Sequence, residues 1–180
     1  KKKDAGQIPM AGYADLMRFA LLEHYGGTWI DSTVYLTEPL PNTILNSDFF
    51  AVRNSLLLID NPVLYPAWLL HAKKENKTIR EIRNVAFSYW LKNEHVIEYL
   101  LPNLIITLVV KSNLEVEKAI PYMNSDYSEY LVKVLADDYS EEKWNWIKKL
   151  TGIHKLTYKL SPDIEAEGTF YKALIENSIE

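Results

Sequence analysis

A glycine pair between a helical segment and a short β-rich segment is the feature that most constrains the fold. Residues 11–25 carry apolar side chains at helical spacing, which predicts a helix, and Gly26-Gly27 ends it because glycine commonly follows a helix end. Residues 28–30 and 33–36 are rich in β-branched and aromatic side chains, which predicts two short strands on either side of Asp31. This order of elements indicates an α/β or α+β fold.

Helices dominate the prediction for the rest of the chain. Further strands are expected at 49–52 and 67–72. Further helices are expected at 78–93, 100–110, 128–136, 141–150 and 165–176. Because no repeat or Pro/Gly/Ser-rich linker divides the chain, we expect residues 1–180 to form a single domain. Within it, residues 1–72 would supply the first helix and the strands, and residues 73–180 would be mainly helical.

Composition excludes several kinds of function. The chain has no cysteine, so disulfides, thiolate metal sites and a cysteine nucleophile are excluded. It has 20 Lys and Arg against 24 Asp and Glu, a net charge of −4, which argues against a nucleic-acid partner. The longest apolar stretch, residues 99–110, is interrupted by polar residues and proline. It is shorter than the roughly 20 residues that span a bilayer.

Three charged side chains near the glycine pair are the best candidates for a site. Asp15 and Arg18 are three residues apart and therefore share one face of the predicted helix. Asp31 follows an apolar strand, and strand ends are where ligands bind in open α/β sheets. Gly26-Gly27 would allow close approach of a ligand. A surface ion pair and a plain turn at residues 31–33 explain the same pattern, and both interpretations stay open.

This stretch resembles the capsular polysaccharide synthesis proteins, sugar transferases related to the Asp-x-Asp transferases of glycosyltransferase family 32. The resemblance rests on Ala14-Asp15-Leu16-Met17-Arg18 and on Tyr25-Gly26-Gly27-Thr28-Trp29-Ile30-Asp31-Ser32-Thr33-Val34. Weaker similarity continues through residues 68–74, 89–91, 98–99, 120–121 and 154–159, which covers most of the chain. The resemblance implies a GT-A-like, Rossmann-like fold that binds a nucleotide-sugar.

The resemblance also implies roles for the matching residues. Asp15 and Arg18 would contact the donor, with Arg18 on its sugar or diphosphate. Asp31 would contact the ribose, the donor sugar or a divalent Mn²⁺ or Mg²⁺ ion, which makes Arg18 and Asp31 the catalytic candidates. Gly26 and Gly27 would border the donor.

Thr33 departs from the wider superfamily, where a second aspartate at this position is the firmest metal ligand. A neutral threonine oxygen is a poor substitute for a carboxylate at a divalent ion, so metal dependence is in question although Thr33 stays a candidate substrate contact.

The departing nucleoside diphosphate gathers negative charge, which a cation must offset. Besides a metal and Arg18, the candidates are His154 and Lys155, with His154 also a candidate metal ligand beside Asp31. A lone histidine is more often structural. Glu98, with Tyr99, could face an acceptor sugar, but an acid at a helix start explains Glu98 equally well.

We therefore expect a glycosyltransferase that moves a sugar, most simply from a UDP-sugar, to a growing capsular or other surface polysaccharide with retention of configuration. Its expected location is the cytoplasm, with peripheral association with a synthesis complex at the inner face of the membrane. The alternatives are a non-catalytic carbohydrate- or nucleotide-binding remnant, a scaffold of such a complex, or a helical interaction module without a ligand.

Few residues precede the first predicted helix, and the chain does not begin with Met. A βαβ unit takes about 30 residues, so we expect the N-terminal base-binding strands to be absent from this chain and the GT-A-like fold to be partial. We therefore expect weak or no transfer by these 180 residues alone.

Overall fold

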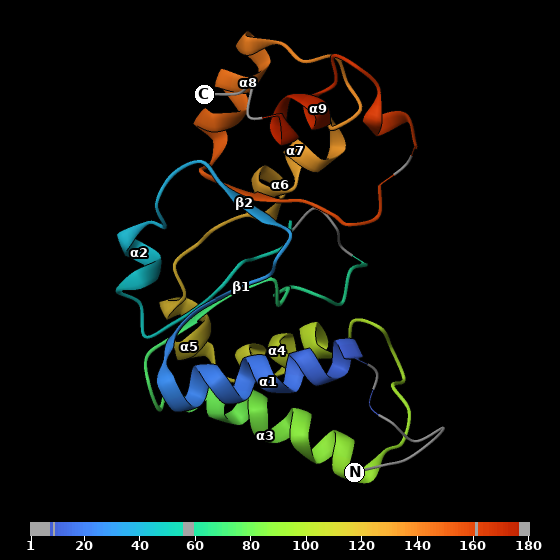
Figure 1. The fold of residues 1–180 in the computed structure, drawn as a ribbon. Coiled ribbons are helices and arrows are strands. Elements are labelled where there is room, and N and C mark those ends of the chain that lie inside the picture. The colour runs from blue at the N-terminus through green and yellow to red at the C-terminus, as the bar shows by residue number, and fades with distance from the viewer. Residues whose placement is uncertain (1–7, 9, 56–59, 161, 177–180) are drawn as a thin grey trace. The chain divides into compact units, whose positions relative to one another are not determined.

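A computed structural model describes residue 8 and residues 10–55, 60–160 and 162–176. The chain divides into two compact units, each built from two separate segments (Figure 1). The first unit is Lys1–Ile30 with Pro41–Met123, and the second is Asp31–Leu40 with Asn124–Glu180. The unit boundaries do not follow the expected change of character at residue 72, because the first unit continues to Met123. The single domain expected from the sequence stays a prediction.

A three-stranded antiparallel sheet forms the centre of the first unit. Its order is β1 (Gly27–Ile30), β4 (Leu69–Ala72) and β3 (Phe49–Ala51). The central strand β4 is buried along its whole length, because both of its neighbours pair with it and helices cover it. His71 of β4 lies opposite Thr28 on one side and Phe50 on the other.

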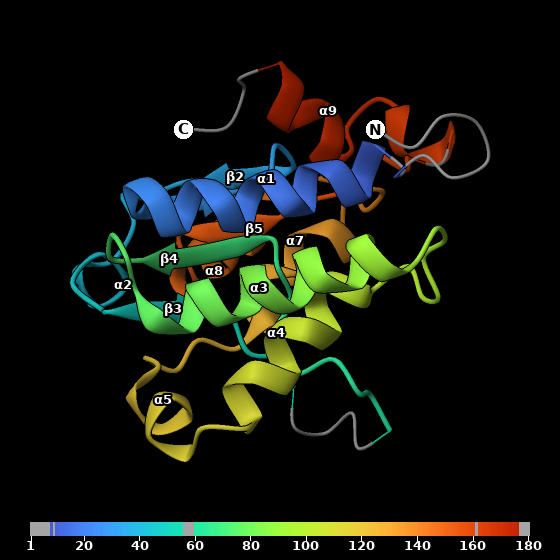
Figure 2. The same ribbon diagram turned by 90° about the horizontal axis from the view of Figure 1, so that it is seen from below.

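Helices pack against this sheet and against one another. They are α1 (Met10–Tyr25), α2 (Asn42–Leu45), α3 (Lys77–Lys92), α4 (Leu101–Lys111) and α5 (Leu114–Ala119). Helix α1 packs on α3 and β4, and α3 packs on α4 (Figure 2). The core between them includes Phe19, Leu22, Leu70, Ile79, Ile82, Ile105 and Ile106. This packing holds α1, which carries Asp15 and Arg18, on a buried framework.

The second unit pairs β2 (Val34–Leu36) with β5 (Ile153–Lys155) in an antiparallel ribbon, with Val34 opposite Lys155. Its helices are α6 (Ser125–Ser128), α7 (Tyr130–Lys133), α8 (Glu141–Leu150), the 3₁₀ helix η2 (Pro162–Glu165) and α9 (Phe170–Ile175). Its core includes Leu131, Leu135, Trp144, Ile147 and Phe170. Helix α8 begins as predicted, because the Ser140 side chain accepts a hydrogen bond from Lys143 N.

Two helix predictions for the second unit are wrong in extent. The chain over 128–136 is not one helix, since α6 ends at Ser128 and α7 covers only Tyr130–Lys133. The helix expected at 165–176 is reduced to Phe170–Ile175, because Gly168 has φ +80° and Thr169 caps a new helix start. In the first unit, the strand expected at 67–72 is confirmed only from Leu69 onward.

The mixed α/β composition is confirmed, and every strand pair in the described residues is antiparallel. The parallel sheet of a complete Rossmann-like fold is not among the residues that the structure describes. Residues 1–7 and 9, where no strand was expected, lie outside the described residues.

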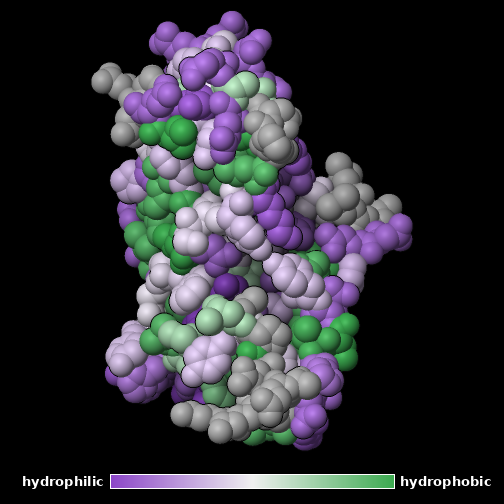
Figure 3. Space-filling model, turned by 45° about the vertical axis from the view of Figure 1, so that its right-hand side comes forward, coloured by the Kyte–Doolittle hydropathy of each residue, from purple (hydrophilic) through white to green (hydrophobic). Residues whose placement is uncertain are grey.

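The surface carries apolar as well as polar side chains. On one face, hydrophobic patches alternate with hydrophilic ones (Figure 3). Large exposed apolar side chains include Met10, Tyr13 and Met17 on α1, Leu91 near the end of α3, and Ile97 between α3 and α4. Within the described ranges, the structure contains no helix with the length and apolar character needed to cross a membrane.

Candidate functional site

Asp15 and Arg18 form an ion pair on α1. Arg18 Nη1 lies 3.3 Å from Asp15 Oδ1 and donates a hydrogen bond of 2.8 Å to the carbonyl oxygen of Ala67. The guanidinium carbon also lies 5.0 Å from the centroid of the Trp29 ring, within cation–π range. Arg18 is only 7% exposed and the Asp15 side chain 19%, so the arginine is buried and the carboxylate half-buried. The surface ion pair that the sequence left open is therefore not what forms.

Burial of Arg18 fixes the position of the Asp15 carboxylate. A buried arginine in contact with a carboxylate, a carbonyl oxygen and an indole ring has little freedom to move, because leaving the carboxylate or the carbonyl oxygen would cost a polar contact of a buried charge. Arg18 is thus better placed to position Asp15 than to reach out to a ligand itself.

Asp15 borders a cavity of about 180 Å³ in the first unit. The other lining residues are mainly apolar: Gly12, Leu16, Phe19, Ala86, Trp90, Val96, Tyr99, Leu101, Pro102 and Ile105. The volume is below the roughly 300 Å³ at which pockets for drug-sized ligands begin, so it suits a small group. A carboxylate that accepts hydrogen bonds beside aromatic faces is a combination that can hold one sugar ring.

Gly26 and Gly27 turn the chain from α1 into β1 with φ of +71° and +98°. A Cβ at Gly26 would lie 2.5 Å from Lys74 N, so the backbone of the protein itself makes the close approach there. At Gly27 a Cβ would meet no atom of the described residues within 4 Å. The predicted approach of a ligand stays a prediction, and Gly27 is the position with room for it.

In the second unit, Asp31 begins a turn that Val34 N closes with a 3.0 Å hydrogen bond to the Asp31 carbonyl oxygen. Lys155 Nζ donates to Thr33 Oγ1 at 2.5 Å and to the Leu156 carbonyl oxygen at 2.9 Å. Leu156 N in turn donates to the Thr33 carbonyl oxygen at 2.8 Å. Thr33 and Lys155 are therefore held together by main-chain and side-chain bonds.

These bonds bear on the divalent metal that the resemblance implies. A metal ion bound to Thr33 Oγ1 at about 2.1 Å would lie within about 5 Å of the Lys155 ammonium, where like charges repel strongly. No cluster of three or more His, Asp or Glu side chains suited to a metal ion occurs in the described part of the chain. The donor set around Thr33, a neutral hydroxyl beside a cation, does not fit Mg²⁺ or Mn²⁺.

His154 lies in the core of the second unit with no exposed surface. Its Nε2 is 3.2 Å from Thr37 Oγ1, and its ring centroid is 5.9 Å from that of Trp144 and 6.1 Å from that of Tyr35. Burial lowers the pKa of His154 to about 4, so the ring is neutral at pH 7. It therefore has no charge with which to offset a diphosphate, and its role as a metal ligand stays a prediction.

Glu98 is exposed just before α4, and its Oε1 accepts a hydrogen bond of 3.4 Å from Leu100 N. This contact fits the interpretation as an acid at a helix start. The neighbouring Tyr99 lines the cavity beside Asp15, whereas Glu98 is not among the lining residues. The expected contact of Glu98 with an acceptor stays a prediction.

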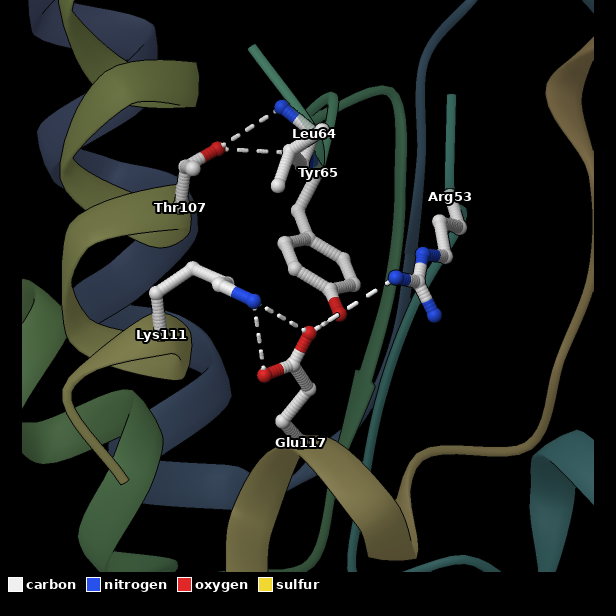
Figure 4. Close-up of polar contacts among 6 residues, drawn as sticks. All are labelled: Arg53, Leu64, Tyr65, Thr107, Lys111 and Glu117. Atoms are coloured by element: carbon white, nitrogen blue, oxygen red, sulfur yellow. Dashed lines mark hydrogen bonds and ion pairs between the residues drawn. The ribbon is translucent and has the colours of Figure 1, made fainter. Parts of the chain in front are cut away.

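A second polar cluster escaped the sequence analysis (Figure 4). Glu117 accepts from Lys111 Nζ at 2.9 and 3.0 Å and from the Tyr65 hydroxyl at 3.5 Å, and it lies 3.7 Å from Arg53 Nη2. Burial, with the Glu117 carboxylate adding to it, raises the pKa of Tyr65. Thr107 Oγ1 accepts from the main-chain nitrogens of residues 64 and 65. These bonds tie α4 and α5 to the segment before β4.

The sequence signal for this cluster was absent, because its members are separated by up to 64 residues, from Arg53 to Glu117, and form no local pattern. The same holds for the contact of Lys155 with Thr33, which are 122 residues apart.

Comparison with known families decides where the chain belongs. Residues 1–174 match the family model described as capsular polysaccharide synthesis protein. The chain belongs to this family. No curated protein matches it. The family match spans both units, so Asp15, Arg18, Asp31, Thr33 and Lys155 all lie inside it. The resemblance is thereby confirmed at the level of the family, and the family relates the chain to the synthesis of capsular polysaccharide.

Proposed function

We propose that this protein is a glycosyltransferase of GT-A-like fold, related to the Asp-x-Asp transferases, that moves a sugar from a nucleotide-sugar to a growing capsular polysaccharide. Membership of the capsular polysaccharide synthesis family supports the proposal. The observation that carries it is the Asp15 carboxylate, which a buried arginine clamps at the border of a small cavity with aromatic walls. Transfer of a sugar needs such a fixed carboxylate to orient the hydroxyl groups of the donor.

In this proposal Asp15, Arg18 and Asp31 have different roles. Asp15 accepts hydrogen bonds from the donor sugar, and Arg18 keeps its carboxylate in place. Asp31, which follows Trp29 by two residues, binds the ribose or the donor sugar. A UDP-sugar is the simplest donor, and retention of configuration is the expected outcome by analogy with related transferases.

A non-catalytic binding module is the second candidate. It is favoured by Arg18, whose guanidinium is engaged with protein groups, and by Thr33, which stands where a carboxylate would be expected. Such a module would bind saccharide without transferring it.

Isothermal titration of the full chain with a panel of nucleotide-sugars separates the two candidates. The proposed function predicts binding of at least one nucleotide-sugar, and Asp15→Asn should weaken it about tenfold or more. Asp48→Asn is the matched control, because Asp48 is exposed and forms an ion pair with Lys73 at the surface. Binding of capsular polysaccharide with no affinity for any nucleotide-sugar would instead establish the binding module.

A further inference from the structure

A lysine ammonium lies beside Thr33, the residue that stands where a metal-bound carboxylate would be expected. Lys155 Nζ lies 2.5 Å from Thr33 Oγ1. Val34 pairs with Lys155 in the β2–β5 ribbon, which places Thr33, the residue before Val34, next to Lys155. Both belong to the second unit. The contact between Lys155 and Thr33 therefore follows from the strand pairing, and does not depend only on the length of the lysine side chain.

We propose that Lys155 and Thr33 form a diphosphate-binding pair that replaces the divalent metal ion, so that the protein binds the nucleoside diphosphate of its donor without a metal. This inference rests on the proposed function and deepens it. In this inference the Lys155 ammonium offsets the negative charge of the departing nucleoside diphosphate.

The polarity of the pair suits an anion. A hydroxyl carries one donor and two acceptor sites, and Thr33 Oγ1 uses an acceptor site for the Lys155 ammonium. Its own O–H is then directed away from the ammonium and can donate to a phosphate oxygen. The pair therefore offers a positive charge and a hydrogen-bond donor together, which is what phosphate oxygens require. An aspartate at position 33 would offer only acceptors.

His154, the other basic residue of β5, is not placed to bind a phosphate. The His154 ring is fully buried between Tyr35 and Trp144, with its Nε2 engaged by Thr37. Lys155 lies at the partly exposed end of β5. Glu129 is an acidic group that interacts electrostatically with Lys155, as it does with Lys133 and Asp126. A purely structural role for Lys155 as the partner of Glu129 is the competing explanation.

The test is the affinity of the full chain for UDP, measured by titration once in EDTA and once in Mn²⁺. The inference predicts that UDP binds in EDTA with an affinity within about threefold of that in Mn²⁺. It also predicts that Lys155→Gln weakens binding in EDTA about tenfold or more, since a charge-assisted phosphate contact is lost. Lys155→Arg should retain binding because it keeps the positive charge.

Two further variants sharpen the result. Thr33→Val removes the hydroxyl donor and should also weaken UDP binding in EDTA, and Thr33→Asp, which offers only acceptors, should weaken it as well. Lys159→Gln, an equal loss of charge at an exposed position, should bind UDP like the wild type. Circular dichroism shows which variants are folded. If Lys155→Gln does not fold, the conservative variants Lys155→Arg and Thr33→Val still decide the test.

UDP binding that requires Mn²⁺, or a folded Lys155→Gln protein that binds UDP as tightly as the wild type, would overturn the inference and leave the proposed function standing. The absence of binding by UDP and by every nucleotide-sugar in both conditions would overturn the proposed function together with the inference.

Discussion

Arg18 connects three parts of the first unit through one side chain. It meets Asp15 on its own helix, the carbonyl oxygen of Ala67 before β4, and the Trp29 ring on β1. The spacing of Asp15 and Arg18 predicted that they share a helix face. The burial of Arg18 could not be predicted, because the groups that enclose it belong to Trp29 and Ala67, which lie 11 and 49 positions further along the chain.

Replacing Arg18 should therefore destabilise the protein. Arg18→Met should lower the free energy of unfolding by about 3 kcal/mol, because it removes the buried guanidinium that pairs with Asp15 and donates to the Ala67 carbonyl oxygen. Arg80→Met is the control: Arg80 pairs with Glu23 at 2.9 Å but is 45% exposed, and its loss should change stability by less than about 1 kcal/mol. Urea denaturation measures both, and equal losses would contradict the buried role of Arg18.

The buried His154 gives a signature in the pH dependence of stability. Its folded-state pKa of about 4 lies below the ordinary 6.5, so between these pH values the unfolded chain binds a proton that the folded protein does not. The contribution of the neutral His154 to the free energy of unfolding is therefore fully present above pH 6.5. It is lost as the pH drops toward 4, by up to about 3 kcal/mol. Burial also lowers the pKa of His71, which adds a fall of the same sign.

His154→Gln should flatten this fall, measured as the free energy of unfolding in urea at a series of pH values. His24→Gln changes an exposed histidine and should leave the slope as it is. If His154→Gln kept the full wild-type slope, burial of a neutral His154 would be wrong.

At the scale of elements, the chain was predictable where local signals agree. Helix α3 has apolar residues at helical spacing and Asn76 as its cap, and α8 has the Ser140 cap, acids first and lysines last. Strand β5 was missed because its partner is β2, more than 110 residues away, and three residues carry little signal of their own. The helix expected at 165–176 failed at Gly168, whose positive φ breaks the helix.

The turn between α1 and β1 tests the packing of elements directly. Gly26→Ala should lower the free energy of unfolding by at least about 2 kcal/mol more than Gly27→Ala. Both substitutions impose a positive φ on alanine, but only the Cβ at Gly26 would meet backbone, at 2.5 Å from Lys74 N. Thermal or urea unfolding compares the two variants. Equal destabilisation would mean that the chain after β4 does not lie against Gly26.

At the scale of the whole molecule, the family match spans both compact units. The sequence predicted the mixed α/β class and the family, because the residues around Gly26-Gly27 form a specific local pattern. The division into two units was not predicted, since each is assembled from segments distant in the chain and no linker marks the boundary. Of the candidate donor contacts, Asp15 and Arg18 lie in the first unit and Asp31 lies in the second.

Sugar transfer by the full chain is the most direct test of the proposed function. The measurement compares kcat/KM for transfer from nucleotide-sugars to capsular polysaccharide by the wild type, Asp15→Asn and the surface control Asp48→Asn. We predict weak transfer from at least one donor, in keeping with the expectation for these 180 residues alone, a loss of about 100-fold for Asp15→Asn, and a wild-type value for Asp48→Asn. A folded Asp15→Asn protein that transfers sugar at the wild-type rate would contradict the role of the clamped carboxylate.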